Sequence, residues 1–461
     1  MRPAIFDHSK DVILMPELPN LSRLADNAAE LVEAAKMAGA DAADAVVASG
    51  RSVSVSVRMG KVEGTNASEG DEFSLRVFCG RRVASISAVK GTDPKRLAER
   101  AVAMARVAPE DPWAELAPQE LLARNIPDLD LFDPTEVSAE ALTQAALEQE
   151  AAALAISGVT NSGGSSASTG FGGMVLVTST GFHGSHMSSR FGRGISVIAG
   201  EGTKMQRDYE FSSRIHFAEL EGAAEIGRKA GERTVKRLNP SKAKTGPVNV
   251  IFDPRVSRGF AGHLAGAING ASVARKTSFL RDKMGEQILA KGVNVIDNPL
   301  RLRGPASRPF DGEGVSAEVL NMVKDGVLKQ WFLSHSIALE LGLKTNGRGA
   351  RSGSTVSASS TNFSFEPGEK SPEELIRDIG TGLYVTEVIG QGVNMATGEY
   401  SRGASGYWIE NGVLTHPVSE VTIAGNLKDM FMNMVLANDV DRNFGTAAPT
   451  LAIHGMTLAG E

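Results

Sequence analysis

Short segments in which apolar and polar residues alternate constrain the fold of this chain more than any other feature. Residues 53–57 read Val-Ser-Val-Ser-Val, and residues 73–79 carry an apolar side chain at every second position, with glycines 60, 64 and 80 between or after the two runs. A period of two places alternate side chains on opposite faces of a strand. The pattern therefore predicts the half-buried strands of a β-meander. The 50 glycines and the 5% aromatic content likewise favour hairpin turns and extended segments over a helical bundle.

Helices are expected on either side of these strands. Apolar residues recur at helical spacing from Leu21 to Ala35, and Asp93-Pro94 supplies an N-cap and a first-turn proline for a second helix. Further helices are predicted over about 138–156 and 218–238. The Gly/Ser-rich residues 157–166 are interpreted as part of a sheet with glycine-rich turns, because short apolar runs follow them closely.

The second half of the chain carries strand and turn signals. Residues 247–252 have the pattern of a buried strand, and Asp325-Gly326 and Asn411-Gly412 are dipeptides typical of two-residue hairpins. A helix is expected over about 427–436. We therefore predict an α+β fold, with N-terminal helix and strand-meander units followed by a β-rich, barrel-like C-terminal domain. The predicted segments are an N-terminal α/β unit at 1–110, a proline-rich linker at 111–137, a glycine-rich sheet with flanking helices at 138–240, and a β-rich C-terminal domain at 241–461.

Charge and cysteine content limit the possible partners. The net charge is −6, which leaves no overall positive field to attract nucleic acid. The single cysteine, Cys79, excludes an intramolecular disulfide and a multi-thiolate metal site. Residues 1–8 reach charged positions before any apolar stretch long enough for a signal peptide, and no window approaches about 18 consecutive apolar residues. We expect a cytoplasmic protein that contacts neither nucleic acid nor membrane.

Motifs for common enzyme chemistry are missing from the sequence. It contains no dinucleotide fingerprint, phosphate-binding loop or nucleophile elbow. His183 and His186 are three residues apart, a spacing that places their rings on opposite faces of a strand. This favours a polar hairpin over a metal site. His335 and His416 are predicted to lie singly on strands.

An ordered set of short motifs along nearly the whole chain resembles the TldD/PmbA proteins, and the PmbA (TldE) branch more than the TldD branch. The motifs are Asp-Tyr-Glu at 208–210, Arg-Lys-Thr-Ser-Phe at 275–279, Pro-Phe-Asp-Gly-Glu-Gly at 309–314, Lys-Asp-Gly-Val-Leu at 324–328, Ser-Arg-Gly-Ala-Ser-Gly at 401–406, Ile-Glu-Asn-Gly-Val-Leu at 409–414, Ile-Ala-Gly-Asn at 423–426 and Gly-Met-Thr-Leu-Ala-Gly at 455–460. The resemblance implies a cytoplasmic peptide-processing metalloprotease, associated by name with the modulation of DNA gyrase and made of two related subunits.

The resemblance also implies that this chain lacks the catalytic metal site. TldD-like chains carry His-Glu-x-x-x-His on a helix and a later cysteine, whereas PmbA-like chains are partners without that motif. Here Arg258 and Gly259 stand at the positions of the first histidine and the glutamate, and only His263 matches the second histidine. A guanidinium has no lone pair to offer a cation, and glycine cannot take a proton from metal-bound water. His263 then either fills a helix-packing or interface position or is the remnant of a ligand set.

We therefore expect a subunit that is inactive alone, with no cofactor of its own, and that pairs with a TldD-like paralogous subunit carrying zinc. Unfolded peptides are the expected substrates, and the resemblance suggests modified antibiotic precursors and antitoxins among them. Extended peptides bind by adding to strand edges, and the candidate contacts are Ser401, Arg402, Gly403, Ser405 and Gly406.

Two other functions remain open from sequence alone. One is an autonomous metal-dependent peptidase with ligands gathered from distant histidines such as His183, His186 and His263. The other is a gyrase-related regulator, which the acidic composition disfavours. The chain expressed alone is also compatible with a homodimer, because a surface built to pair with a paralogue can pair with its own copy.

Overall fold

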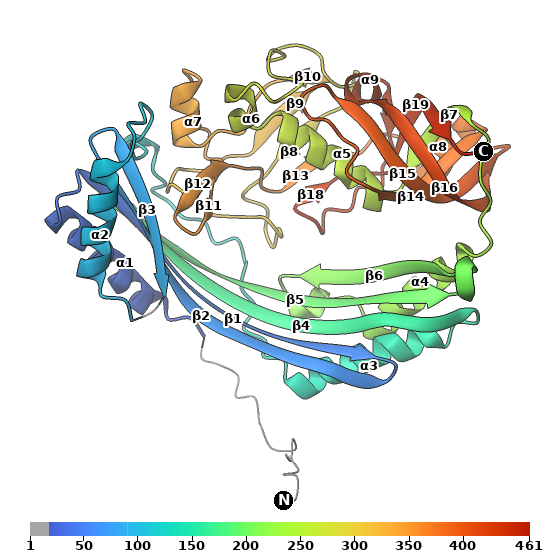
Figure 1. The fold of residues 1–461 in the computed structure, drawn as a ribbon, viewed down its shortest axis with the longest axis horizontal. Helices are drawn as coiled ribbons and strands as arrows, with labels where there is room; N and C mark the ends of the chain where they lie inside the picture. The colour runs from blue at the N-terminus through green and yellow to red at the C-terminus, as the bar shows by residue number, and fades with distance from the viewer. Residues whose placement is uncertain (1–17, 90) are drawn as a thin grey trace, which may run out of the picture.

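The computed structural model describes residues 18–89 and 91–461, which form two layers that face each other (Figure 1). A long, curved sheet from the first half of the chain makes one layer, and the β-rich C-terminal half makes the other. Helices cover the outer, convex face of the sheet, so its concave face looks towards the C-terminal half. The predicted α+β class is confirmed. The N-terminal residues on which the signal-peptide prediction rested lie outside the described residues.

Six strands form the long sheet in the order β3-β2-β1-β4-β5-β6, and every neighbouring pair is antiparallel. Their bounds are β1 Ala42–Arg58, β2 Lys61–Cys79, β3 Arg82–Val89, β4 Val159–Thr178, β5 His183–Ala199 and β6 Gln206–Arg214. β1 lies at the centre, where Gly50 pairs with Gly70 on one side and with Gly172 on the other. The predicted segments 1–110 and 138–240 therefore each contribute three strands to one sheet.

Four helices pack on the convex face of this sheet: α1 Leu21–Met37, α2 Pro94–Val107, α3 Ala139–Leu154 and α4 Ala223–Lys236. The side chains of Asn20, Asp93 and Ser138 cap the first three helices, each accepting a backbone N–H of the first turn. α4 lies directly against α3, because a Cβ atom at Gly227 would be only 2.0 Å from the carbonyl oxygen of Gln149. These helices agree with the periodicity predicted from the sequence.

The proline-rich segment 111–137 is irregular apart from the short 3-10 turn Gln119–Leu121. It is nevertheless anchored, because Leu122 is buried and forms an isolated β-bridge with Val315 of the C-terminal half. The predicted linker thus runs from one layer to the other with its apolar side chains packed.

Five strands of the C-terminal half close into a barrel, as predicted. The order is β16-β15-β14-β7-β19, and β16 also pairs with β19, which joins the two ends. The β14–β7 pair is parallel, and β17 continues the sheet beyond β19. The bounds are β7 Gly246–Phe252, β14 Gly382–Ile389, β15 Glu399–Glu410, β16 Val413–Asn426, β17 Met434–Leu436 and β19 Leu451–Ala459.

A smaller sheet, a hairpin and short helices surround the barrel. The sheet has the order β10-β9-β8-β13-β18. Its strands are β8 Val295–Asp297, β9 Leu320–Lys324, β10 Val327–Leu328, β13 Phe363–Phe365 and β18 Thr446–Ala447, and the hairpin is β11 Gly349–Ser352 with β12 Thr355–Ala358. The helices are α5 Pro254–Ala267, α6 Gly270–Ala274, α7 His335–Glu340, α8 Pro372–Ile379 and α9 Leu427–Met432. Across the described ranges, we find no helix with the length and apolar character needed to cross a membrane.

Both predicted hairpin turns are confirmed. Asp325 and Gly326 join β9 to β10 with φ of 49° and 76°, and Asn411 and Gly412 join β15 to β16 with φ of 52° and 76°. Two consecutive left-handed residues are what a two-residue hairpin requires, and Asn, Asp and Gly adopt that conformation at the lowest cost.

Two local predictions were wrong and a third was right only in part. Residues 159–178 belong to the predicted sheet but form one continuous strand, without the expected glycine-rich turns inside it. His335 begins helix α7, where its N–H donates to Oε2 of Glu313 at 2.7 Å. The C-terminal helix ends at Met432, and the chain turns into β17 before Leu436. In each case the chain's contacts with the rest of the fold decided a conformation that local composition left ambiguous.

Candidate functional site

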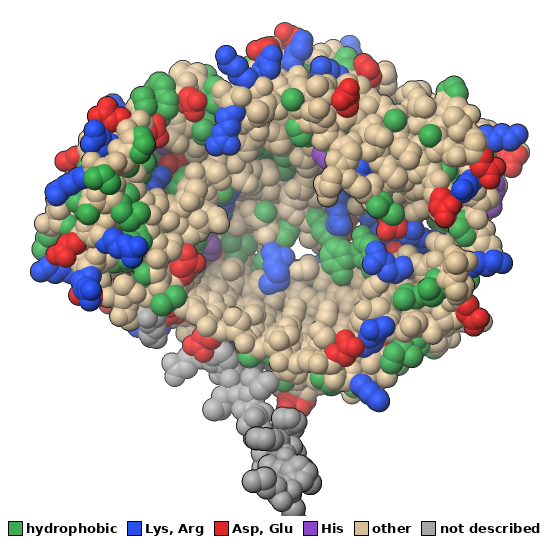
Figure 2. Space-filling model, viewed as in Figure 1, with side chains coloured by type: hydrophobic (Ala, Val, Ile, Leu, Met, Phe, Trp, Pro, Cys, Tyr) green, Lys and Arg blue, Asp and Glu red, His purple; other side chains and the backbone are tan. Residues whose placement is uncertain are grey.

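A cavity of about 890 Å³ lies between the two layers. Its floor is the concave face of the long sheet, and Gly304, Pro305 and Ser307 of the C-terminal half form part of its wall. Figure 2 shows the hollow between the layers, whose lower wall carries few charged side chains. An open, weakly charged hollow of this size can admit a segment of extended chain.

Glycine and serine make up most of the cavity floor. The residues concerned are Gly50 and Ser52 of β1, Ser68 and Gly70 of β2, Gly170 and Gly172 of β4, and Ser188 of β5. They share one face because each lies directly opposite another in the strand register, as with Gly172 and Ser188. The alternate residues, such as Val53 and Val55, are buried under the helices. The floor is therefore smooth, and another backbone can approach it closely.

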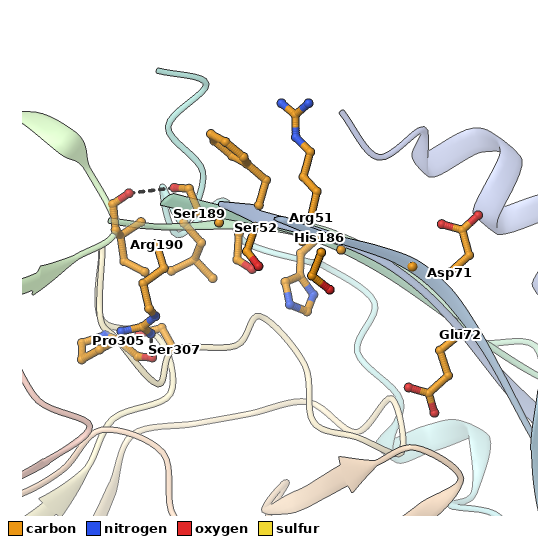
Figure 3. Close-up of a pocket in the computed structure, with 18 of the residues that line it drawn as sticks. Arg51, Ser52, Asp71, Glu72, His186, Ser189, Arg190, Pro305 and Ser307 are labelled. Atoms are coloured by element: carbon orange, nitrogen blue, oxygen red, sulfur yellow. Dashed lines mark hydrogen bonds between the residues drawn. The ribbon is translucent and has the colours of Figure 1, made fainter. Parts of the chain in front are cut away.

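A few larger polar side chains project from the floor. Figure 3 shows Glu72, His186 and Arg190 pointing to the cavity side of the sheet, whereas Arg51 and Asp71 point to the other side. Arg190 is anchored to the opposite layer, because its Nη2 donates to the Pro305 carbonyl at 3.0 Å. Few charged groups therefore face the cavity, and one of them, Arg190, is engaged in a hydrogen bond within the protein.

His186 is held neutral by its surroundings. Burial lowers its pKa to about 4, and its ring makes an edge contact with Phe310, with ring centroids 5.7 Å apart. No hydrogen-bond partner for its Nδ1 is present in the part of the chain that the structure describes. His183 is exposed on the same strand. Among residues 18–89 and 91–461, no group of three or more His, Cys, Asp or Glu side chains is arranged to hold a metal ion.

Helix α5 places the three predicted metal-site positions along its open side. The Arg258 guanidinium stacks on Phe444 at 4.4 Å from the ring centroid and lies 5.8 Å from that of Phe211. Gly259 is exposed, and a Cβ atom there would meet nothing within 4 Å. His263 makes an edge contact with the ring of Tyr400, with the centroids 6.3 Å apart.

These residues do not fit a catalytic metal. Arg258 is cationic and packed between aromatic rings, Gly259 has no side chain, and His263 would be a lone nitrogen ligand. Burial, followed by the charge of Arg402, lowers the pKa of His263. A lone imidazole near the Arg402 guanidinium offers no set of donors for zinc, which needs three or four. The three positions on α5 therefore do not provide the ligands of a catalytic metal.

Strand β15 brings the predicted peptide contacts beside α5, but they differ in exposure. Ser401 is exposed and Arg402 is half-buried, with its Nε donating to the Ile389 carbonyl at 3.3 Å. Ser405 is buried, and its Oγ accepts a hydrogen bond from Arg237 at 2.8 Å. The other two residues are glycines. Gly403 is half-buried, and Gly406 is buried so tightly that an added Cβ atom would lie only 1.8 Å from the Tyr384 carbonyl oxygen. Peptide contact at 401–406 stays a prediction, and Ser401 and Arg402 are its accessible side chains.

Sequence reasoning missed the glycine and serine floor. The signal was present, because residues 49–57 read Ser-Gly-Arg-Ser-Val-Ser-Val-Ser-Val, with small side chains at every second position. The alternation predicts that the valines are buried. The small residues between them lie on the opposite face of the strand, where they form an open surface. The pairing of this row with β4 and β5 joins distant segments, so the sequence did not indicate the whole floor.

Solved structures define the class of protein to which this architecture belongs. One from Bacteroides thetaiotaomicron, described as a putative modulator of DNA gyrase, has a TM-score of 0.88, 26% sequence identity, and coverage of 95% of this chain and 99% of that chain. TldE from Thermococcus kodakarensis has a TM-score of 0.82 at 20% identity, covering 95% of this chain and 100% of that chain, and therefore shares the fold.

Sequence comparisons identify the family. Models of the PmbA/TldA metallopeptidase match residues 43–105 (domain 1), 132–238 (central domain) and 245–460 (C-terminal domain). Metalloprotease PmbA of Escherichia coli O157:H7 is 39% identical, covering 91% of this chain and 93% of that protein, and a PmbA homologue of Haemophilus influenzae is 35% identical over 93% and 94%. The chain therefore belongs to the PmbA/TldD family, and the resemblance inferred from its motifs is confirmed.

Proposed function

We propose that this chain is a non-catalytic, PmbA/TldE-like subunit of a TldD/TldE-type metalloprotease. It holds unfolded peptide in extended form between its two layers, while a TldD-like paralogous subunit supplies zinc and cleaves the peptide. The observation that carries the proposal is the chemistry of α5, where Arg258 is cationic and Gly259 has no side chain at the positions that the family motif would give to a ligand and a general base.

The cavity floor supports the peptide-holding part of this proposal. Small side chains let an extended chain of almost any sequence lie close to the floor, and serine hydroxyls can donate to or accept from its backbone. The names of the relatives support the link to proteolysis, since they are called metalloprotease PmbA or its homologue. Under this proposal the complex acts on unfolded peptides in the cytoplasm.

The test is a cleavage assay with the two subunits separate and mixed. An unfolded peptide with a donor dye at one end and a quencher at the other is incubated with this chain, with a TldD-like paralogue from the same organism, and with both. We expect cleavage only in the mixture, because neither chain alone combines the metal with the complete chamber.

Two results would contradict the proposal. Full activity of the paralogue alone would remove any need for this chain. Chelator-sensitive cleavage by this chain alone, with zinc bound at one equivalent, would show an autonomous peptidase whose ligands include residues outside α5. The paralogue with its motif glutamate replaced by glutamine is the matched control, and mixtures containing it should be inactive.

A further inference from the structure

Arg258 lies between the two layers, and nothing in the described structure neutralises its charge. Its guanidinium stacks on Phe444 and lies near Phe211, but it forms no ion pair or hydrogen bond with any described residue. Arg255, on the same helix, is paired with Asp208 at 2.9 Å, and Arg237 pairs with Asp208 at 3.2 Å. The charge of Arg258 is therefore available to a ligand, whereas those of its neighbours are balanced within the fold.

A second cation stands near the same helix. Arg402 of β15 donates to a backbone carbonyl but has no carboxylate partner among the described residues. Tyr400, two residues before Arg402 on β15, contacts the His263 ring with the centroids 6.3 Å apart, so Arg402 lies on the strand face that looks towards α5. Along the open side of α5, ideal Cβ atoms at Gly259 and Gly262 would meet nothing within 4 Å. The helix face therefore carries the charge of Arg258, has Arg402 on the neighbouring strand, and is open at its two glycines.

The stacking of Arg258 prepares it to bind an anion of a particular shape. A guanidinium held over an aromatic ring loses part of its freedom to move, while its N–H groups can still donate to an anion. Two parallel N–H donors match the two oxygens of a carboxylate, which makes the pair both stronger and more selective than a contact with a lone lysine. Partial burial strengthens the attraction because water screens it less.

We propose that the open face of α5 is a carboxylate-binding site, with Arg258 as its anchor and Arg402 as a second cation. Its ligand is a carboxylate of the bound peptide, either an acidic side chain or the free C-terminus. This inference rests on the proposed function and deepens it, because it names a class of peptide that the subunit prefers. The residues that replaced the metal-binding pair thus acquire a role in selecting substrate.

The test measures binding of dye-labelled unfolded peptides to the full chain by fluorescence anisotropy. Four versions of one glycine- and alanine-rich peptide are compared: the parent with one glutamate and a free C-terminus, the Glu→Gln version, the C-terminally amidated version, and the version with both changes. We expect the doubly changed peptide to bind about tenfold more weakly than the parent, equivalent to about 1.4 kcal/mol. Whichever single change reproduces the loss identifies the source of the carboxylate.

Variants then assign the preference to Arg258. Arg258→Gln should lose most of the preference for carboxylate and keep only the part that Arg402 supplies, whereas Arg258→Lys should retain more of it because lysine keeps the charge without the bidentate geometry. Arg100→Gln is the matched control, since Arg100 is an exposed residue of α2 on the convex side. Thermal unfolding of each variant checks that the fold is intact.

The outcomes separate this inference from the function on which it rests. If the wild-type chain binds the parent and the doubly changed peptide equally, or if Arg258→Gln keeps the wild-type preference, the carboxylate site is wrong. Peptide binding by itself would still support the proposed function in that case. A chain that binds none of the four peptides overturns both.

Discussion

Gly227 and Gly259 occupy comparable positions inside two helices but have opposite surroundings. A Cβ atom at Gly227 of α4 would be 2.0 Å from the Gln149 carbonyl oxygen of α3, whereas one at Gly259 of α5 would meet nothing within 4 Å. We expect Gly227→Ala to lower the free energy of unfolding by at least about 2 kcal/mol, because α4 must move away from α3. Gly259→Ala should raise it by up to about 1 kcal/mol, because alanine favours a helix more than glycine does.

Urea denaturation of the two variants measures both effects and makes each the control for the other. Equal shifts of the two midpoints would contradict the packing argument, since intrinsic helix propensity alone favours alanine at both positions. A loss at Gly259→Ala would mean that another group covers the open side of α5, as a tightly associated second subunit would.

Sequence could indicate some roles at the residue scale and not others. The resemblance to the family motif predicted Arg258, Gly259 and His263 as the positions of a lost metal site. The stacking of Arg258 could not be predicted, because Phe211 comes from β6 and Phe444 from the loop before β18. Contacts between distant segments depend on how the two layers face each other, which no local pattern describes.

At the scale of elements, the long sheet combines a packed face with a binding face. Gly70 of β2 lines the cavity, and a Cβ atom there would meet nothing within 4 Å. We expect Gly70→Phe to fold and to weaken binding of unfolded peptide at least about tenfold, because the ring fills space that the peptide needs. Anisotropy of a dye-labelled peptide and a thermal unfolding curve measure the two properties on one sample.

Gly64 provides the matched control on the same strand. It also has open space around it, but it does not line the cavity. Gly64→Phe should therefore bind peptide as the wild-type chain does. Unchanged binding by a folded Gly70→Phe variant would place the peptide elsewhere, and the strand edges of the barrel would be the next region to test.

Alternation made some elements predictable and left others ambiguous. β1 and β2 were predicted because branched and aromatic residues occupy one face, and the hairpins were predicted because Asp-Gly and Asn-Gly favour left-handed backbone. β4 was only partly predicted, because glycine and serine occupy much of its length and carry little hydrophobic signal. β4 adopts the extended conformation because it pairs with β1 on one side and with β5 on the other.

At the scale of the whole molecule, a buried ionic cluster joins the two layers. Asp44 of β1 accepts from Arg76 of β2 at 2.5 Å and lies 2.6 Å from the guanidinium of Arg351 on β11. Arg76 also lies 3.8 Å from Glu313 of the C-terminal half. Because each layer supplies both acids and bases, separating the layers would leave charges without partners in a poorly solvated place.

Asp311, two residues before Glu313 and within the electrostatic reach of Arg76, is an acid that should respond to pH near neutrality. Burial, and then the charge of Glu313, raise the pKa of Asp311 from 3.8 to about 7. The folded chain therefore binds more protons at this site than the unfolded chain between about pH 4 and 7, so this site stabilises the fold increasingly as pH falls through that range. His186 acts in the opposite direction, because burial lowers its pKa from 6.5 to about 4 and acidification then favours unfolding.

Glu313→Gln separates these opposing contributions. Removing the neighbouring charge lowers the pKa of Asp311, so the gain on acidification shrinks while the loss from His186 remains. We expect the free energy of unfolding of the variant to fall more steeply than that of the wild-type chain from pH 7 to 5, by about 1 to 2 kcal/mol. Urea denaturation at several pH values measures the two profiles.

Glu110→Gln, at an exposed carboxylate, is the control and should follow the wild type. Parallel profiles for Glu313→Gln and the wild type would mean that Asp311 does not titrate in this range. The junction between the layers would then keep the same charge state across neutral pH.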